Sequence, residues 1–160
     1  MDKQSHVPTV SVVIATYNSI QTIERCLSSV RSQNYPQKKI DILIADGGSV
    51  DKTLEVIKKF DVTVFHVPTH LQNAEYNKGV AVRKARGEIL LMIDHDNVLP
   101  YKEWLINMMQ PLHDHKEVVG VETLRYKYDK KSSLLDRYFA LYGAGDPLAF
   151  YLGKADRLSY

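Results

Sequence analysis

Two kinds of apolar pattern alternate along the chain, one typical of buried strands and one typical of amphipathic helices. Short, uninterrupted apolar runs predict strands that are buried on both faces. Residues 89–93 are an uninterrupted run of this kind, and the mainly apolar segments 9–15, 40–45, 62–67 and 118–121 predict further strands. Apolar residues that recur at every third or fourth position predict helices between them, at residues 19–33, 50–60, 73–86 and 101–113.

This order of strands and helices predicts an α/β fold with a mainly parallel sheet of about five strands, flanked by helices on both faces. The run Ile89–Ile93 contains no polar residue, so we expect it in the middle of the sheet. Three helix-end signals fit this arrangement. Asn18 with Gln21 resembles a capping box, Ser49 is a candidate N-cap, and Gly87 is expected to end a helix.

The composition bounds the function classes. A chain of 160 residues with 44% apolar and 25% charged residues is typical of one globular domain. A net charge of +2 without a dense basic cluster argues against nucleic-acid binding. Cys26, the only cysteine, lies beside an apolar helical stripe, so we expect a buried side chain and no disulfide framework. We expect a cytoplasmic protein, because no signal peptide opens the chain and no apolar run reaches membrane-spanning length.

Polar residues follow three of the predicted strands, as Thr16-Tyr17-Asn18, Asp46-Gly47-Gly48-Ser49 and Asp94-His95-Asp96-Asn97. In an open α/β sheet, the carboxyl ends of parallel strands share one edge, and ligands bind there. Adjacent glycines would let the backbone turn sharply and let a ligand approach closely. The three segments together therefore predict a ligand site.

Asp94 and Asp96 are two residues apart, so in an extended chain both carboxylates point to the same side. A hard divalent cation prefers oxygen ligands of this kind. Two acids at the mouth of an apolar strand would also repel each other without a cation. The alternative is that Asp96 or Asn97 caps the following helix, since Pro100 stands where first-turn prolines stand. The position of the acidic pair favours the metal site.

The last 35 residues differ from the rest, because six of the ten tyrosines lie beyond Arg125. One more amphipathic helix is predicted there from Leu134, Leu135, Tyr138, Phe139 and Tyr142. We expect a longer chain, a second copy of the chain or a membrane surface to cover this aromatic region. The alternative is a tail that packs on its own domain.

Several segments together resemble family 2 glycosyltransferases, whose fold is the nucleotide-sugar-binding GT-A fold. The segments are Val10–Asn18, Asp46–Thr53, Asn77–Gly79, Gly87–Asp96 and the following Leu99-Pro100 and Trp104. They stand in the order and spacing of the family and cover about residues 8–122. The resemblance implies a single donor-binding domain over residues 1–160, in which residues 123–160 begin an acceptor region or an interface.

For such a domain the resemblance implies binding of a nucleoside-diphosphate sugar, UDP- or GDP-linked, through Mg²⁺ or Mn²⁺. The sugar would pass, with inversion, to an acceptor saccharide, lipid-linked or protein, and contact with the inner face of the cell membrane would be peripheral. Asp96 would bind the metal directly, and Asp94 would hold the ribose or a metal-bound water. Tyr17 would pack on the base, and Asp46 would accept a hydrogen bond from the base or the ribose. The full set of implied nucleotide-sugar contacts is Thr16, Tyr17, Asn18, Asp46, Gly48, Asn77, Lys78 and Asp94.

Two departures from the family pattern limit what the resemblance implies. Family members often carry Arg where this chain has Tyr76, which leaves Lys78 as the candidate for the missing positive charge. Inverting members also need a carboxylate base, and neither Asp146 nor Asp156 stands in a suitable acidic motif. The catalytic base is therefore unassigned, and we expect the chain to be the donor-binding part of a longer enzyme.

Two rival functions remain beside the transferase. A non-catalytic nucleotide-sugar-binding or assembly module would keep the pocket but lack the base and the acceptor site, and it would serve a partner, such as a second copy in a homo-oligomer, through its C-terminal aromatic region. A dinucleotide-dependent oxidoreductase would need Gly-x-Gly-x-x-Gly after the first strand. That position holds Thr16-Tyr17-Asn18, so this function is disfavoured.

Overall fold

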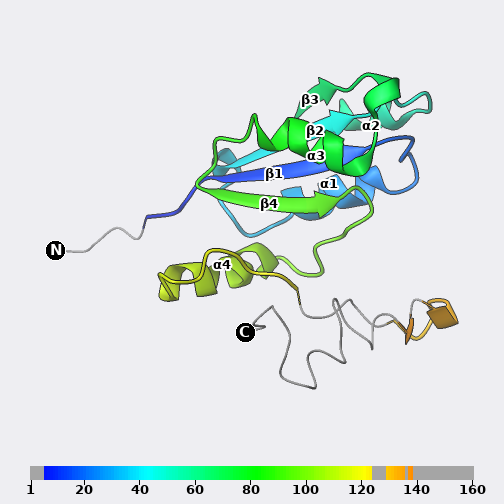
Figure 1. Ribbon diagram of the computed structural model, residues 1–160. Coiled ribbons are helices and arrows are strands. Elements are labelled where there is room, and N and C mark those ends of the chain that lie inside the picture. Colours follow the sequence, from blue (N-terminus) through cyan, green and yellow to red (C-terminus); the bar gives the residue numbers. More distant parts are fainter. Residues whose placement is uncertain (1–5, 124–128, 136, 139–160) are drawn as a thin grey trace, which may run out of the picture. The chain divides into compact units, whose positions relative to one another are not determined.

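Figure 1 shows the computed structural model, which describes residues 6–123, 129–135 and 137–138. The chain forms two compact units, Met1–Glu103 and Trp104–Tyr160. All strands of the described residues belong to the first unit, and this unit also carries the candidate site.

Four parallel strands form the sheet of the first unit (Figure 1). They are β1 (Val10–Thr16), β2 (Ile40–Asp46), β3 (Thr63–His66) and β4 (Ile89–Asp94), in the order β3-β2-β1-β4. Every residue of β1 is buried, because β1 pairs with β2 on one side and with β4 on the other. The chain runs from β1 to β2 and β3 in one direction and then returns to the far side of β1. This reversal places a topological switch point between β1 and β4.

The predicted parallel sheet is confirmed, but two details of the prediction are wrong. β4 is an edge strand of the described sheet, and Leu90 and Met92 are 43% and 58% exposed there. An uninterrupted apolar run therefore identified the strand but not its neighbours. Residues 118–121, the predicted fifth strand, form no strand, since no described strand pairs with them and Val119 is 97% exposed.

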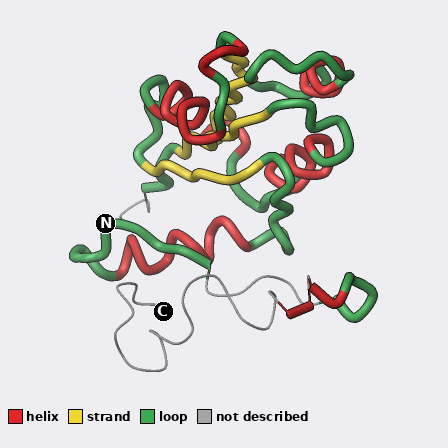
Figure 2. The backbone as a smooth tube through the Cα atoms, turned by 45° about the vertical axis from the view of Figure 1, so that its right-hand side comes forward, coloured by secondary structure: helices red, strands yellow, loops and turns green. Residues whose placement is uncertain are grey.

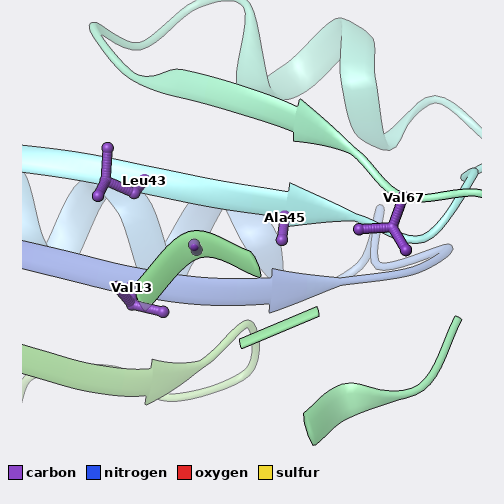
Figure 3. Packing of buried hydrophobic residues seen from close by; sticks show 5 residues of the cluster. Val13, Leu43, Ala45 and Val67 are labelled. Atoms are coloured by element: carbon purple, nitrogen blue, oxygen red, sulfur yellow. The ribbon is translucent and has the colours of Figure 1, made fainter. Parts of the chain in front are cut away.

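Helices cover both faces of the sheet, as Figures 1 and 2 show. α3 (Ala74–Val82) packs on one face, where Ala81 lies in a buried cluster with Val13, Leu43, Ala45 and Val67 (Figure 3). The small side chain of Ala81 lets the helix approach the strands closely. The first helix of the chain, α1 (Ile23–Arg31), covers the opposite face and buries Ile23, Cys26, Leu27 and Val30. The predicted burial of Cys26 is thus confirmed.

The helices are shorter than the apolar spacing predicted, and their ends use other residues. α1 starts at Ile23 rather than residue 19, and its N-cap Thr22 makes no side-chain cap hydrogen bond, so the expected Asn18 capping box is absent. Asn18 instead has a positive φ of 48°. α2 (Thr53–Ile57) has Lys52 rather than Ser49 at its N-cap.

Gly87 does not end α3, which stops at Val82 and is capped by Arg83. A Cβ atom at Gly87 would collide with the backbone of β1 at Ser11 N and Val10 C. The Ser11 hydroxyl also accepts a hydrogen bond from Gly87 N at 2.8 Å. Gly87 is therefore required where the chain passes close to β1 before entering β4.

The second unit begins with α4 (Trp104–Asp114), close to the helix predicted for residues 101–113. Because α4 begins at Trp104, neither Asp96 nor Asn97 is its N-cap and Pro100 is outside its first turn. The predicted helix from Leu134 to Tyr142, and the aromatic region beyond it, lie largely outside the described residues. Among the described residues, no helix is both long and apolar enough to cross a membrane.

Candidate functional site

Three polar segments predicted to meet do meet at the carboxyl edge of the sheet. Thr16 pairs with Asp46 across β1 and β2, and Ala15 pairs with Asp94 across β1 and β4. Gly47 N donates to Thr16 O at 2.9 Å, which continues the ladder past the end of β2. The parallel register alone thus brings these segments together, beside the switch point where open sheets bind ligands.

The loop after β1 is joined to the loop after β2 by side-chain hydrogen bonds. Asn18 Oδ1 accepts from Val50 N at 2.9 Å, and Asn18 N donates to Ser49 Oγ at 2.9 Å. Ser19 N donates to Thr53 Oγ1 at 2.8 Å, one residue further along. Asn18 therefore holds the two loops together. Its positive φ of 48° suits this residue type, because Asn tolerates the left-handed region.

Thr16 and Tyr17 differ in their access to solvent. Thr16 is 2% exposed, and its hydroxyl is hydrogen-bonded to the hydroxyl of Ser19. Tyr17 is 39% exposed, so its ring can meet a ligand at the sheet edge.

Asp46 is fully buried, and its own loop surrounds its carboxylate. Gly48 N and Ser49 N each donate to Asp46 Oδ2 at 3.0 Å, and Ser49 Oγ donates to Oδ1 at 2.5 Å. Gly48 has a φ of +88°, which glycine adopts at no steric cost and which turns these donors toward the carboxylate. The carboxylate therefore shapes the glycine turn.

On α3, Asn77 and Lys78 face different surroundings. Asn77 is 1% exposed, and its Oδ1 has no hydrogen-bond partner among the described residues. A Cβ atom at Gly47 would lie 2.9 Å from Asn77 Nδ2, so the Asn77 side chain lies against the glycine turn. Lys78 Nζ lies 2.8 Å from Asp94 Oδ1 and 3.8 Å from Glu75 Oε1. The hydrogen bond that Lys78 donates to Asp94 raises the pKa of Lys78, so Lys78 is a cation at the mouth of β4.

Residues 94–97 form a hydrogen-bonded turn rather than the extended chain that the sequence argument assumed. Asn97 N donates to Asp94 O at 3.0 Å, and Asp94 N donates to Asn97 Oδ1 at 3.0 Å. Asn97 Nδ2 lies 3.4 Å from Asp96 Oδ1. The alternation rule for strands therefore does not apply to Asp94 and Asp96.

Both carboxylates affect one side chain of α1, the thiol of Cys26. Burial raises the pKa of the Cys26 thiol to about 12, and the charges of Asp96 and Asp94 add to the rise. Cys26 Sγ is also 3.6 Å from Asp94 O, which makes a weak hydrogen bond. Both acids are exposed, so both are accessible to a ligand.

The donor set fits a divalent cation only in part. The described residues hold no group of three or more His, Cys, Asp or Glu side chains that could bind a metal ion. Two exposed carboxylates suit a hard cation that takes its remaining ligands from water and from substrate phosphates, as Mg²⁺ commonly does. Asp94 and Asp96 could therefore supply two of the oxygen ligands of such a cation, but the described residues do not form a complete metal site.

Sequence reasoning missed one contact at this edge. His95, between the two acids, has its Nδ1 2.9 Å from Thr22 Oγ1, although 73 positions separate the two residues. Nothing in the local pattern around Thr22 signals this contact. Asp146 and Asp156, the acids weighed as a catalytic base, lie outside the described residues.

Comparison with known proteins gives a consistent result. The family model described as glycosyl transferase family 2 matches residues 11–152. Glycosyltransferase AglE of Haloferax volcanii is 31% identical over 105 residues, which cover 63% of this chain and 34% of AglE. Poly(ribitol-phosphate) beta-N-acetylglucosaminyltransferase TarS of Staphylococcus aureus is 29% identical over 93 residues, which cover 56% of this chain and 16% of TarS. The chain thus spans about a third or less of the length of these two relatives.

Solved structures share the fold. The crystal structure of TarS 1–349 in complex with UDP-GlcNAc matches with a TM-score of 0.66 at 25% identity, over 79% of this chain and 36% of that chain. Mannosyltransferase PcManGT from Pyrobaculum calidifontis, in complex with GDP-Man and Mn²⁺, matches with a TM-score of 0.64 at 24% identity. That match covers 78% of this chain and 37% of PcManGT, and it bears on the fold alone. The expected fold class is confirmed, with four strands in place of about five.

Proposed function

The chain belongs to glycosyl transferase family 2, and from this premise we propose that its sheet edge binds a nucleoside-diphosphate sugar together with a divalent cation. The observation that carries the proposal is the meeting of three polar strand ends at the switch point, with Lys78 bonded to Asp94 there. Structural neighbours that hold UDP-GlcNAc, or GDP-Man with Mn²⁺, support it. In this proposal the bound sugar is transferred with inversion to an acceptor saccharide, lipid-linked or protein.

The nucleoside would lie over the loops that follow β1 and β2. The exposed ring of Tyr17 offers a surface for stacking on the base. Asp46 would act mainly through the turn that it organises, since three donors of its own loop already reach its carboxylate. A carboxylate has about four lone-pair sites, so one hydrogen bond from the base or the ribose is still compatible with these contacts.

The diphosphate would lie at the end of β4. Asp94 and Asp96 would hold Mg²⁺ or Mn²⁺ jointly with the phosphate oxygens, and the cation would stabilise negative charge on the leaving nucleoside diphosphate. Lys78, protonated and 2.8 Å from Asp94, supplies a second positive charge at the same place. In this proposal Lys78 supplies the positive charge near the phosphates that family members often supply with an Arg at the position of Tyr76.

The test is calorimetric binding of UDP and GDP to the full chain, with Mn²⁺ and with a chelator. We expect Mn²⁺ to strengthen the binding of one nucleotide and Asp96→Ala to weaken this metal-dependent binding by about tenfold or more. Asp61→Ala is the matched control, because Asp61 is an exposed acid in the connection between α2 and β3. Binding without any metal dependence, or unchanged binding in Asp96→Ala, would contradict the proposal.

Transfer must be separated from binding, because the chain spans about a third or less of AglE and TarS. A panel of UDP- and GDP-sugars should be assayed with the chain for release of the nucleotide, together with its oligomeric state. Release of nucleotide from one donor would support the transferase. Nucleotide binding without turnover, in a homo-oligomer, would support the non-catalytic binding module instead.

A further inference from the structure

The central residue of the acidic turn makes a contact that the proposed function does not use. His95 Nδ1 lies 2.9 Å from Thr22 Oγ1, and both side chains are partly buried. Thr22 is the residue before α1, and its hydroxyl makes no capping hydrogen bond to that helix. The hydroxyl is therefore available to the turn between Asp94 and Asn97.

Thr22 is itself held in place by the loop after β1. Thr22 N donates to Ser19 O at 3.0 Å, and Thr22 Oγ1 lies 3.3 Å from the same carbonyl oxygen. Ser19 N donates to Thr53 Oγ1 at 2.8 Å, which extends the chain of contacts to α2. If the Thr22 hydroxyl donates to Ser19 O, His95 Nδ1–H donates to Thr22. If it donates to His95 instead, Nδ1 is the acceptor, so either tautomer preserves the contact.

A second contact comes from the next turn of the same helix. Cys26 Sγ lies 3.6 Å from Asp94 O, and Cys26 is four residues after Thr22. Positions four apart lie on the same face of a helix. The start of α1 thus touches the acidic turn twice, once at the His95 side chain and once at the Asp94 main chain.

We propose that His95 is a positioning residue, which fixes the Asp94 and Asp96 carboxylates relative to the loop after β1 through Thr22. This inference rests on the proposed function, because that function puts the cation at Asp94 and Asp96 and the nucleoside over the loop after β1. The contact would keep the cation-binding carboxylates at a fixed distance from the nucleoside-binding loop, so that one nucleotide can contact both at once. Binding is much stronger where the contacting residues are held to within about half an ångström of the required geometry. In this proposal His95 and Thr22 act through the turn at Asp94 and Asp96 and not by direct contact with the cation or the nucleoside.

The test compares Thr22→Val, which keeps the side-chain shape but removes the hydroxyl, with Thr22→Ser, which restores it. Nucleotide affinity is measured by calorimetry with saturating Mn²⁺ and again with a chelator. We expect Thr22→Val to lower the Mn²⁺-dependent affinity roughly tenfold and to leave metal-free affinity unchanged. Thr22→Ser should bind as the unmodified chain does. A loss shared equally by the metal-bound and metal-free measurements would show a merely structural role and overturn the inference.

A double-mutant cycle with His95→Ala tests whether the contact is the cause. We expect Thr22→Val, His95→Ala and the double variant to lose the same metal-dependent affinity, because each of them removes the hydrogen bond between His95 and Thr22. Additive losses would overturn the inference, as would unchanged Mn²⁺-dependent binding in Thr22→Val. Absence of metal-dependent binding in the unmodified chain would instead overturn the proposed function, and the inference with it.

Discussion

Asp46 and Asp94 occupy equivalent places in the fold, at the carboxyl ends of β2 and β4, yet their surroundings differ completely. The Asp46 side chain is 0% exposed, and three donors of its own loop reach it. The Asp94 side chain is 54% exposed, and Lys78 is its ion-pair partner. One acid is part of the framework, and the other is open to a ligand.

The backbone that follows each strand explains the difference. After β2, the glycine pair turns with a φ of +88° at Gly48, so that main-chain N–H groups point back at the carboxylate. After β4, the turn is closed by the Asn97 side chain and by main-chain atoms, which leaves the Asp94 carboxylate free of its own loop. The number of hydrogen bonds that an acid receives from its own loop therefore decides whether its main role is structural, as for Asp46, or whether its carboxylate is open to a ligand, as for Asp94.

The largest effect on stability is expected from Asp46→Ala. Removing this buried acceptor leaves Gly48 N, Ser49 N and the Ser49 hydroxyl without their partner, which should lower the free energy of unfolding by about 3 kcal/mol. Urea unfolding followed by circular dichroism measures the change. Asp46→Asn is the matched control, because it keeps one acceptor oxygen and should lose less. If the free energy of unfolding falls only as little as it does when an exposed acid is removed, water replaces the carboxylate as acceptor. Asp46 would then be no more structural than Asp94.

A smaller effect on stability is expected at the end of β4 from Lys78→Met. The Asp94 side of the ion pair is 54% exposed and the Lys78 side 21% exposed, so water screens the pair in part and its loss should cost about 1 kcal/mol or less in unfolding free energy. Nucleotide affinity should fall roughly tenfold in the same variant, because the proposed site would lose its charge-assisted bond from Lys78 to phosphate. Lys84→Met, an exposed lysine just beyond α3, is the control for loss of charge alone. If Lys78→Met destabilises the chain as much as Asp46→Ala does, the ion pair at the end of β4 has a structural role like that of Asp46, which would contradict the comparison.

Much of this edge could be predicted from sequence, because it depends on local patterns and on one topological rule. The apolar runs located all four strands, and parallel pairing then brought Thr16, Asp46 and Asp94 together without any further information. The roles assigned to Tyr17, Asn77 and Lys78 toward a ligand stay predictions. The structure adds that Asn77 is buried against the glycine turn and that Lys78 is bonded to Asp94.

The remaining features depend on contacts between distant segments or on backbone angles, which local patterns do not encode. The expected capping role of Ser49 was wrong because its hydroxyl bonds to Asp46 instead. The contact of His95 with Thr22 depends on how α1 packs behind β4 and has no sequence signature. The edge position of β4 could not be read from Ile89–Ile93, because hydrophobicity alone does not specify which strands pair.

The smallest expected effect is on the pH dependence of stability, and it concerns Glu88 at the opposite end of β4. Glu88 differs from both Asp46 and Asp94, because it is exposed but receives several hydrogen bonds. Thr9 N and Thr9 Oγ1 both donate to Glu88 Oε1, and His6 Nε2 lies 2.6 Å from Oε2. The hydrogen bond from Thr9 N, followed by that from His6, lowers the pKa of Glu88 from its ordinary value of 4.5 to about 2. The folded chain therefore favours the charged form of Glu88.

Because the folded pKa of Glu88 lies below the unfolded one, its contribution to stability is complete above about pH 4.5 and is lost as the pH falls toward 2. Unfolding midpoints in urea between pH 6 and pH 2 should show a steeper decline for the unmodified chain than for Glu88→Gln, which cannot titrate. Other carboxylates titrate equally in both proteins, so the difference between the two curves isolates Glu88. Parallel curves would mean that solvent screens these contacts entirely, and saturation by hydrogen bonds would then mark a structural acid only where it is also buried, as Asp46 is.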